Sequence, residues 1–332
     1  MIKGLFVFDA VVHMYNLSGK NLKPRPDAQH TQDYLLRLGQ LARAPEESTR
    51  YEPFAREWTV EDMGRLLFEE SETDMAMAQV VPLFDWWVDG FAPIRSQYEL
   101  ARAFPGRVLF CEGVDPAFQG VDGACRSMRV QAEEMGAVSF KFYNAHVDGN
   151  SWHCDDRQIA YPMYEEARRL GVRVLQFHKG LPLGPVNMED LRPNDLQAPA
   201  RDFPELIFII HHLGLPYFEE TLSIAARFPN VYLALSGNIN MYVIAPRMVQ
   251  EQLGRLLLYC GPEKLLWGSE AALYGSPQPY LEAFLGLQIP DDLRQSYGYP
   301  QITVEHKRLI LGENFARIMG IKVGQPQARV GK

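Results

Sequence analysis

Eight short apolar runs recur along the chain, and longer amphipathic segments separate them. The runs cover 5–13, 75–81, 107–114, 137–143, 172–178, 206–212, 231–237 and 264–270. They are apolar throughout instead of alternating, as expected for parallel strands that are covered on both faces. Helical patterns fall between them, for example over 124–136, 162–171 and 218–230. Eight strand–helix units predict an α/β fold, a (β/α)8 TIM barrel.

One segment departs from this alternation. It is the polar stretch 14–60 between the first two expected strands. Loops of that length in a compact domain are usually functional or carry small elements of their own. We expect a cap over one end of the barrel, inside a single domain that spans 1–332. We expect the tail, 324–332, to be frayed.

Composition excludes several classes of partner. The chain has 332 residues and a net charge of −8, which argues against nucleic acid or an anionic membrane surface. No apolar run approaches the roughly 20 residues that span a bilayer, and the N-terminal run is too short for a secretory signal. The four cysteines form no CxxC pair. These features predict a cytoplasmic protein with reduced thiols.

Ionisable residues stand at the carboxyl ends of most of the expected strands, where TIM barrels build their active sites. They are Asp9, His13, Glu112, Lys141, His178, His211, His212 and Glu270. A single histidine closing an apolar strand is more often a core residue, but so many candidates at one rim predict a metal site. His211 and His212 are adjacent, so on a strand only one of them is expected to face the barrel interior, with the other against a helix.

Position 11 in the first strand offers no metal donor, although it is expected to share a face with two residues that do. Side chains at i, i+2 and i+4 share a face, so Asp9, Val11 and His13 should all point into the barrel. Valine cannot bind a metal, and Glu112 and Glu270 could supply what is missing. Sites that mix histidines with carboxylates suit iron or manganese, whereas nitrogen-rich sites suit zinc.

Lys141 has three interpretations. It could be carboxylated to a carbamate that bridges two metals, it could be a cation that binds substrate, or it could form a structural ion pair with Glu112 or Asp115.

Aromatic and polar residues near the same rim are candidates for substrate binding. Phe84, Trp86 and Trp87 follow the second strand and could form an aromatic wall, or could equally pin the loop to the barrel. Tyr143 and Asn144 directly follow Lys141, and His146 lies on the same loop.

Five motifs in order resemble the amidohydrolase superfamily, specifically its second large family of small barrel hydrolases and decarboxylases. They are FDAVVH, VLQFHKG, IIHHLG, LLWGSEA and ILGENFARIMGI. The resemblance covers residues 5–320 and implies metal ligation by His13, His178 and Glu270, and it places the sixth-strand histidine at His212. Two departures stand out: Val11 replaces a histidine, and Glu270 replaces an aspartate that also handles the proton of the catalytic water.

Three hypotheses follow. The first is an O2-dependent hydroxylase (a monooxygenase) of a small organic substrate, similar to a branch of the superfamily with two metals, iron and/or manganese. Its expected metal ligands are His13, Glu112, Lys141, His178, His212 and Glu270, with Glu270, His178 and Lys141 catalytic. Electrons would come from an external reductant, because no flavin or NAD fingerprint is present.

The second hypothesis is a hydrolase or non-oxidative decarboxylase with one zinc or manganese. The third is a non-catalytic subunit paired with an active homologue. Family analogy also suggests a homo-oligomer or a hetero-oligomer with a homologous subunit.

Overall fold

Eight parallel strands form the centre of the computed structural model, which describes residues 1–45 and 55–323. The strands are β1 (Phe8–Val12), β2 (Met75–Gln79), β3 (Val108–Gly113), β4 (Ser139–Phe142), β5 (Val174–Phe177), β6 (Ile207–Ile210), β7 (Val231–Ala234) and β8 (Leu265–Leu266). Each pairs with the next in sequence order. The predicted TIM barrel is therefore confirmed. The tail predicted to fray, 324–332, lies outside the described residues.

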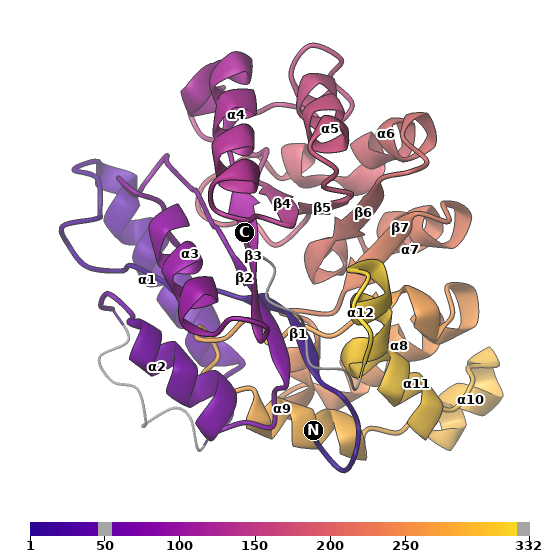
Figure 1. Cartoon of the computed structure of the whole chain (residues 1–332). Coiled ribbons are helices and arrows are strands. Elements are labelled where there is room, and N and C mark those ends of the chain that lie inside the picture. Colours follow the sequence, from indigo (N-terminus) through magenta and orange to yellow (C-terminus); the bar gives the residue numbers. More distant parts are fainter. Residues whose placement is uncertain (46–54, 324–332) are drawn as a thin grey trace.

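Helices surround the strands (Figure 1). They are α1 (Pro26–Leu41), α2 (Val60–Gly64), α3 (Ile94–Ala103), α4 (Pro116–Glu133), α5 (Ala160–Arg169), α6 (Gln197–Asp202), α7 (Phe218–Arg227), α8 (Pro246–Tyr259), α9 (Gln278–Gly286), α10 (Asp291–Tyr297), α11 (Val304–Arg308) and α12 (Asn314–Ile318). None of the described helices is both long and apolar enough to span a membrane.

Contacts between β1 and the last strand segment bring the two ends of the sheet together. The Ala10 amide donates to the Trp267 carbonyl over 3.0 Å, and the Glu270 amide donates to the Val11 carbonyl over 3.0 Å. Val12 and Ala271 form a further parallel bridge. The barrel is thus nearly closed, and the residues that follow β8 lie beside those at the end of β1.

A bulge interrupts β1. Asp9 pairs with Ala76 and Val12 with Ala78, so three steps on β1 match two on β2. The expected alternation over Asp9, Val11 and His13 is therefore wrong in part. Val11 does belong to the apolar cluster inside the barrel, together with Ala10.

Asp9 instead turns toward the segment after β8. Its Oδ1 accepts hydrogen bonds from the amides of Val11 (3.1 Å) and Ser269 (2.9 Å). Burial, the largest effect, raises the pKa of this carboxyl to about 7, although the bonds from Ser269 and Val11 oppose the shift. Asp9 joins the two ends of the sheet and lies outside the cavity described below.

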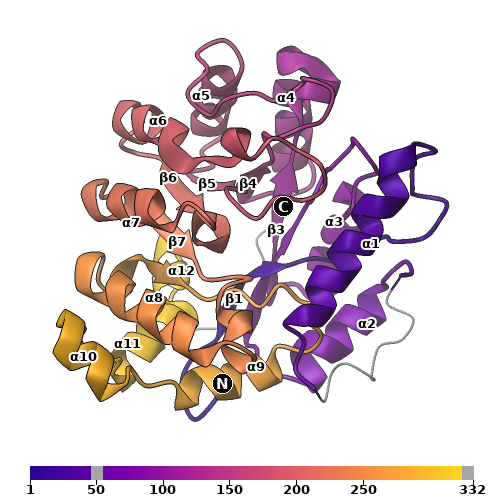
Figure 2. The ribbon, with the colours of Figure 1, turned by 180° about the vertical axis from the view of Figure 1, so that it is seen from behind.

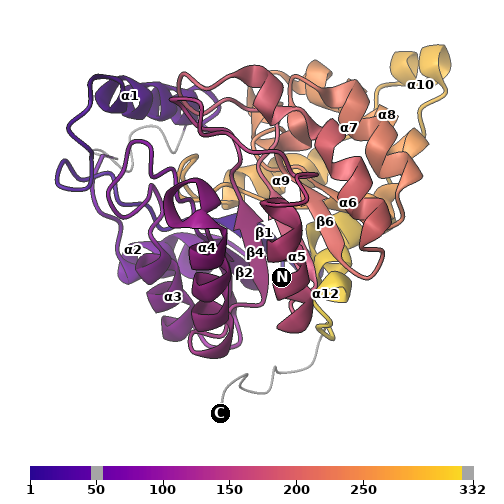
Figure 3. The same cartoon turned by 90° about the horizontal axis from the view of Figure 1, so that it is seen from above.

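Helix α1 comes from the long segment between β1 and β2. Proline at its first position suits a helix start, and its buried residues, Ala28, Thr31, Gln32, Leu35 and Gly39, follow a helical period. Figure 2 shows α1 at the front beside β1, and in Figure 3 it lies above the level of α2, α3 and α4. It therefore stands over the carboxyl ends of the strands, where the sequence predicts a cap.

Candidate functional site

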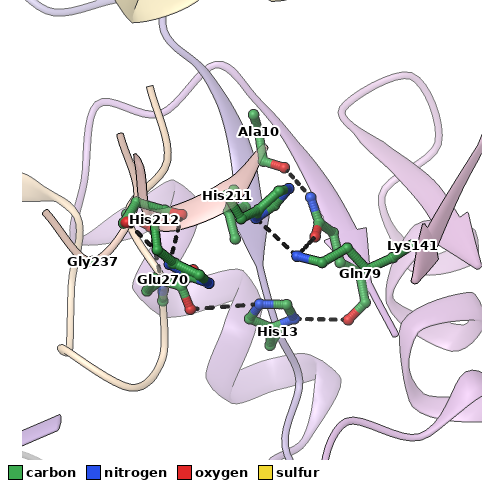
Figure 4. A network of polar contacts seen from close by, with 12 residues as sticks. Ala10, His13, Gln79, Lys141, His211, His212, Gly237 and Glu270 are labelled. Atoms are coloured by element: carbon green, nitrogen blue, oxygen red, sulfur yellow. Dashed lines mark hydrogen bonds and ion pairs between the residues drawn. The ribbon is translucent and has the colours of Figure 1, made fainter. Parts of the chain in front are cut away.

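Three histidines and one glutamate from four strand ends converge at the carboxyl side of the barrel. His13 follows β1, His178 follows β5, His212 follows β6, and Glu270 follows β8. All four are buried, and all four line one cavity. Figure 4 shows His13, His212 and Glu270 turned toward one another.

Each of the three imidazoles is oriented by a backbone carbonyl. His13 Nδ1 lies 2.8 Å from the Gln79 oxygen, His178 Nε2 lies 2.9 Å from the Leu181 oxygen, and His212 Nδ1 lies 3.1 Å from the Ser236 oxygen. A carbonyl only accepts, so each of these nitrogens donates its proton, and in a neutral ring the other nitrogen carries the lone pair. This is the usual support of a histidine that binds a metal.

Glu270 contributes a buried carboxylate between two of these rings. Its Oε2 lies 3.6 Å from His13 Nε2, and its Oε1 lies 3.7 Å from His212 Nδ1. Burial alone would raise its pKa, but its contacts with His13, His212 and Lys141 outweigh burial and lower the pKa to about 2. Its backbone has a φ of +58°, a conformation that is costly outside glycine and recurs at functional sites.

Two buried atoms of this group have no hydrogen-bond partner among the described residues: Glu270 Oε1 and His178 Nδ1. Buried polar atoms are normally satisfied, so such exceptions point to an unseen partner. Burial lowers the pKa of His178 well below its usual value and that of His212 to about 4, so both rings are neutral near pH 7. These two neutral imidazoles, the ring of His13 and an ionised carboxylate fit a divalent metal such as zinc.

His211 and His212 both face the barrel interior, which contradicts the expectation that one of them would pack against a helix. Strand β6 ends at Ile210, and His212 has a left-handed backbone with φ +56° and ψ +23°. This turn abolishes the alternation of a strand. The two rings stand 5.6 Å apart at an angle of 68°.

His211 lies next to the candidate metal ligands but is not counted among them. A nitrogen of His211, a nitrogen of His212 and an oxygen of Glu270 all lie within 4.8 Å of one another. Both His211 nitrogens are already bonded, however: Nε2 donates to Gln176 Oε1 over 2.8 Å, and Nδ1 accepts from Lys141 Nζ over 2.8 Å (Figure 4). We therefore place His211 beneath the candidate ligands.

Lys141 belongs to the same buried network. Its amine also donates to Gln79 Oε1 over 3.4 Å, and Gln79 in turn donates to Gln176 over 2.9 Å. Burial lowers the pKa of Lys141 to about 7, against the opposing charge of Glu270. Of the three interpretations of Lys141, the ion pair with Glu112 or Asp115 is wrong, because the Lys141 amine bonds to His211 and Gln79 instead.

Glu112 is not brought to this group. Its neighbour Cys111 lies in the apolar cluster inside the barrel, and successive strand residues face opposite sides, so the Glu112 side chain faces the helices. Neither of its carboxyl oxygens has a hydrogen-bond partner among the described residues, and burial raises its pKa well above the usual value. The prediction of Glu112 as a ligand assumed that Glu112, and not Cys111, faces the barrel interior.

The cavity above the metal-binding candidates is apolar on its other sides. It leaves about 30 Å³ for the centre of a water-sized sphere, which is room for roughly one or two waters or an ion. Its further lining residues are Tyr15, Leu35, Leu38, Val81, Phe91, Tyr143, Leu181, Leu183, Gly237, Leu273 and Tyr274. Leu35 and Leu38 come from α1, so the long segment after β1 contributes to this cavity.

Of the six residues predicted to bind substrate, the structure brings Tyr143 to this cavity, where its ring stacks on His178 at 4.8 Å. Asn144 donates instead to the Trp152 and Asp190 carbonyls. Trp86 and Trp87 are fully buried, and Trp86 donates to Asp27 of α1 over 2.9 Å. They therefore fix the loop to the barrel, which is the second of the two interpretations given for these residues in the sequence analysis.

Phe84 and His146 also lie away from the cavity. Phe84 packs edge-on against Phe118 at 5.9 Å. His146 Nδ1 lies 2.8 Å from Asp85 Oδ2, and its Nε2 lies 3.3 Å from Asp115 Oδ1. One imidazole thus joins the loops after β2, β3 and β4.

This imidazole should make stability depend on pH. Burial lowers the pKa of His146, but the hydrogen bonds to Asp115 and Asp85 outweigh it and raise the pKa to about 9. A raised pKa stabilises the fold fully below the unfolded value of about 6.5 and loses that contribution as pH rises through about 9. We expect the free energy of unfolding, measured in urea, to fall between these values, and the fall to diminish in His146→Asn. An identical fall in the variant would contradict this assignment.

Several residues of the site were missed by the sequence reasoning. Gln79 and Gln176 form the network beneath the metal-binding candidates, and each is a polar residue within an otherwise apolar strand. That pattern was a usable signal. Leu35 and Leu38 carried none, since an apolar helix face looks the same over a cavity as over a core.

Comparison with known proteins is consistent with this geometry. An amidohydrolase family model matches residues 9–321. Protein fluG of Emericella nidulans is 32% identical over 101 residues, which make up 30% of this chain and 11% of fluG, so the match spans a small part of that relative.

Solved structures share the fold over nearly the whole chain. An uncharacterized TIM-barrel protein of Bordetella bronchiseptica superposes with a TM-score of 0.67, 19% identity and coverage of 95% of this chain and 99% of the other. 5-Carboxyvanillate decarboxylase of Sphingomonas paucimobilis superposes with a TM-score of 0.57 and 16% identity, and the match covers 96% of this chain and 100% of the other. An amidohydrolase of Burkholderia multivorans with bound zinc superposes with a TM-score of 0.59 and 16% identity, and the match covers 96% of this chain and 100% of the other. The family match covers most of the chain, which therefore belongs to the amidohydrolase family of metal-dependent TIM-barrel enzymes.

Proposed function

We propose that the chain is a hydrolase that uses one divalent metal, zinc in the first instance, to cleave a carbon–nitrogen or carbon–oxygen bond of a small organic substrate. One observation carries the proposal. Three imidazoles oriented by backbone carbonyls line one cavity with a buried carboxylate, and two of the atoms in this group, Glu270 Oε1 and His178 Nδ1, lack a hydrogen-bond partner among the described residues.

The donors favour one metal over two. A second metal would need further carboxylates, and Glu112 faces the helices. Lys141 already donates to His211 and Gln79. Four residues remain as ligands: His13, His178, His212 and Glu270. The zinc bound in the Burkholderia multivorans structure supports the choice of metal.

The residues divide the chemical work. A divalent ion bound by these ligands acts as a Lewis acid and lowers the pKa of water. Glu270, which is held ionised, can accept the proton of the attacking water. Lys141 and His211, which are bonded to each other, fix the directions of the hydrogen bonds beneath the reacting group. The apolar walls exclude bulk water, so that these charges act at low dielectric.

Non-oxidative decarboxylation is the second candidate, because the apolar lining of the cavity matches the apolar faces of an aromatic ring. One relative by fold is a decarboxylase of an aromatic acid. In that reaction the metal-binding end would hold the carboxylate and Glu270 would first have to gain a proton. Because Glu270 is ionised near pH 7, it holds no proton to give to a ring carbon, and hydrolysis therefore remains the first candidate.

One assay, run without O2 and repeated with O2 and a reductant, separates the hypotheses. The zinc-loaded protein is supplied with small esters, lactones, amides and aromatic acids in water labelled with oxygen-18. We expect turnover without O2 and one labelled oxygen in the acid product. Release of CO2 with no labelled oxygen in the organic product would favour the decarboxylase. Turnover that appears only with O2 and a reductant would overturn the proposal in favour of the monooxygenase.

A further inference from the structure

Outside the metal-binding candidates, the cavity is lined mostly by apolar side chains, and part of this lining comes from the long segment after β1. Leu35 and Leu38 of α1 line it together with Leu273, Tyr274 and Phe91. No lysine or arginine is among the described residues that line it. The polar groups outside the metal-binding end are tyrosine hydroxyls, whose pKa values are raised by burial, so they stay uncharged.

The helix that supplies these leucines is tied down at both ends. At its start, Trp86 Nε1 donates to Asp27 over 2.9 Å. Just after its end, Arg43 Nη2 donates to the Leu273 carbonyl over 2.8 Å, and the Ala44 amide donates to the Tyr280 hydroxyl over 3.0 Å. The leucine side chains can change rotamer without moving the helix.

The space that the leucines leave is too small for an organic substrate as it stands. About 30 Å³ is far below the roughly 150 Å³ of a cavity that binds benzene. Space for a ring must come from movement of the side chains around the cavity. Leu35 and Leu38 belong to the insertion, and their rotation would enlarge the cavity without disturbing a strand.

We propose that Leu35 and Leu38 determine specificity, and that they restrict the substrate to a compact molecule with one carbonyl or carboxyl group on an otherwise uncharged, apolar body. This inference rests on the proposed function, since it takes the metal-binding end as the partner of that one polar group. A second anionic group would be buried against leucines without a cation, which is costly. 5-Carboxyvanillate, with its two carboxylates, would therefore be a poor ligand.

The test is a set of calorimetric titrations on zinc-loaded full-length protein, whose metal content is measured first. Benzoate and isophthalate share a ring and differ by one carboxylate. We expect wild type to bind isophthalate at least tenfold more weakly than benzoate. 2-Naphthoate adds a second apolar ring, and we expect Leu35→Ala and Leu38→Ala each to bind it at least tenfold more tightly than wild type.

Leu41→Ala is the matched control, because Leu41 ends the same helix with its side chain 59% exposed. It should leave all three affinities unchanged. Equal binding of benzoate and isophthalate, or naphthoate affinity unchanged in both cavity variants, would overturn the assignment. Zinc-loaded wild type that binds no benzoate would also overturn the assignment, but it would not contradict the metal site. Protein that takes up no zinc would instead refute the proposed function itself.

Discussion

Replacing Glu270 by glutamine is expected to lower metal affinity and turnover by at least about 100-fold each. The amide keeps the size of the side chain but removes the negative charge that lies 3.6 Å from His13 and 3.7 Å from His212. Loss even of a residue that only orients a ligand typically costs 10- to 100-fold in metal affinity, and loss of a general base about 10²- to 10⁴-fold in rate. Metal titration and steady-state kinetics measure the two effects separately.

Glu263→Gln is the control for this variant, because Glu263 precedes β8 and is exposed. It should match wild type in both measurements. If Glu270→Gln retained wild-type metal affinity and lost only turnover, Glu270 would be a base but no ligand. If it retained both, the carboxylate would have no part in the site.

The second large effect concerns stability next to the site. Lys179 follows His178, and its amine lies 2.8 Å from Asp195 Oδ2, with both side chains buried. Burial disfavours the charge on Lys179, but Asp195 outweighs it and raises the pKa of the lysine. Lys179→Met would leave a buried carboxylate unpaired, so we expect a loss of about 3–5 kcal/mol in the free energy of unfolding.

The double variant Lys179→Met/Asp195→Asn tests the cause of that loss. Asparagine is uncharged and can still accept the hydrogen bond that the Cys154 amide donates to Asp195 over 2.9 Å. The double variant should therefore recover much of the stability in urea unfolding experiments. Equal destabilisation in the single and double variants would show that lost packing, and no unpaired charge, explains the effect.

The barrel could be predicted from sequence because its signal is local. Eight uninterrupted apolar runs can be buried on both faces only in a parallel sheet covered by helices. The strand ends also brought His13, His178, His212 and Glu270 together, since parallel strands place their carboxyl ends at one rim. These inferences needed only the strand boundaries and the common direction of the strands.

The other features of the site depend on backbone geometry that the sequence pattern does not display. The bulge in β1 changed which residues of 9–13 share a face. The left-handed turn at His212 put two adjacent histidines on one side. The facing of Glu112 depends on the phase of a strand in which every residue is apolar or buried. Backbone geometry decided each of these, and the apolar pattern was equally compatible with the other outcome.

Val11 raised the question whether the site had lost its function. In the structure its side chain packs among Phe8, Met77 and Cys111 inside the barrel, while four other donors remain together above it. The absence of a histidine at position 11 therefore removes one donor without dispersing the rest. This favours an active metal site over a non-catalytic subunit.

Elemental analysis of metal per chain tests this account most directly. The protein is expressed with zinc, iron and manganese all supplied, and His178→Ala is measured beside wild type. We predict about one divalent ion per wild-type chain, mainly zinc, and much less in the variant, because His178 provides one of four ligands. About two ions per chain, rich in iron or manganese, would contradict the single-metal site, and no bound metal would contradict the site altogether.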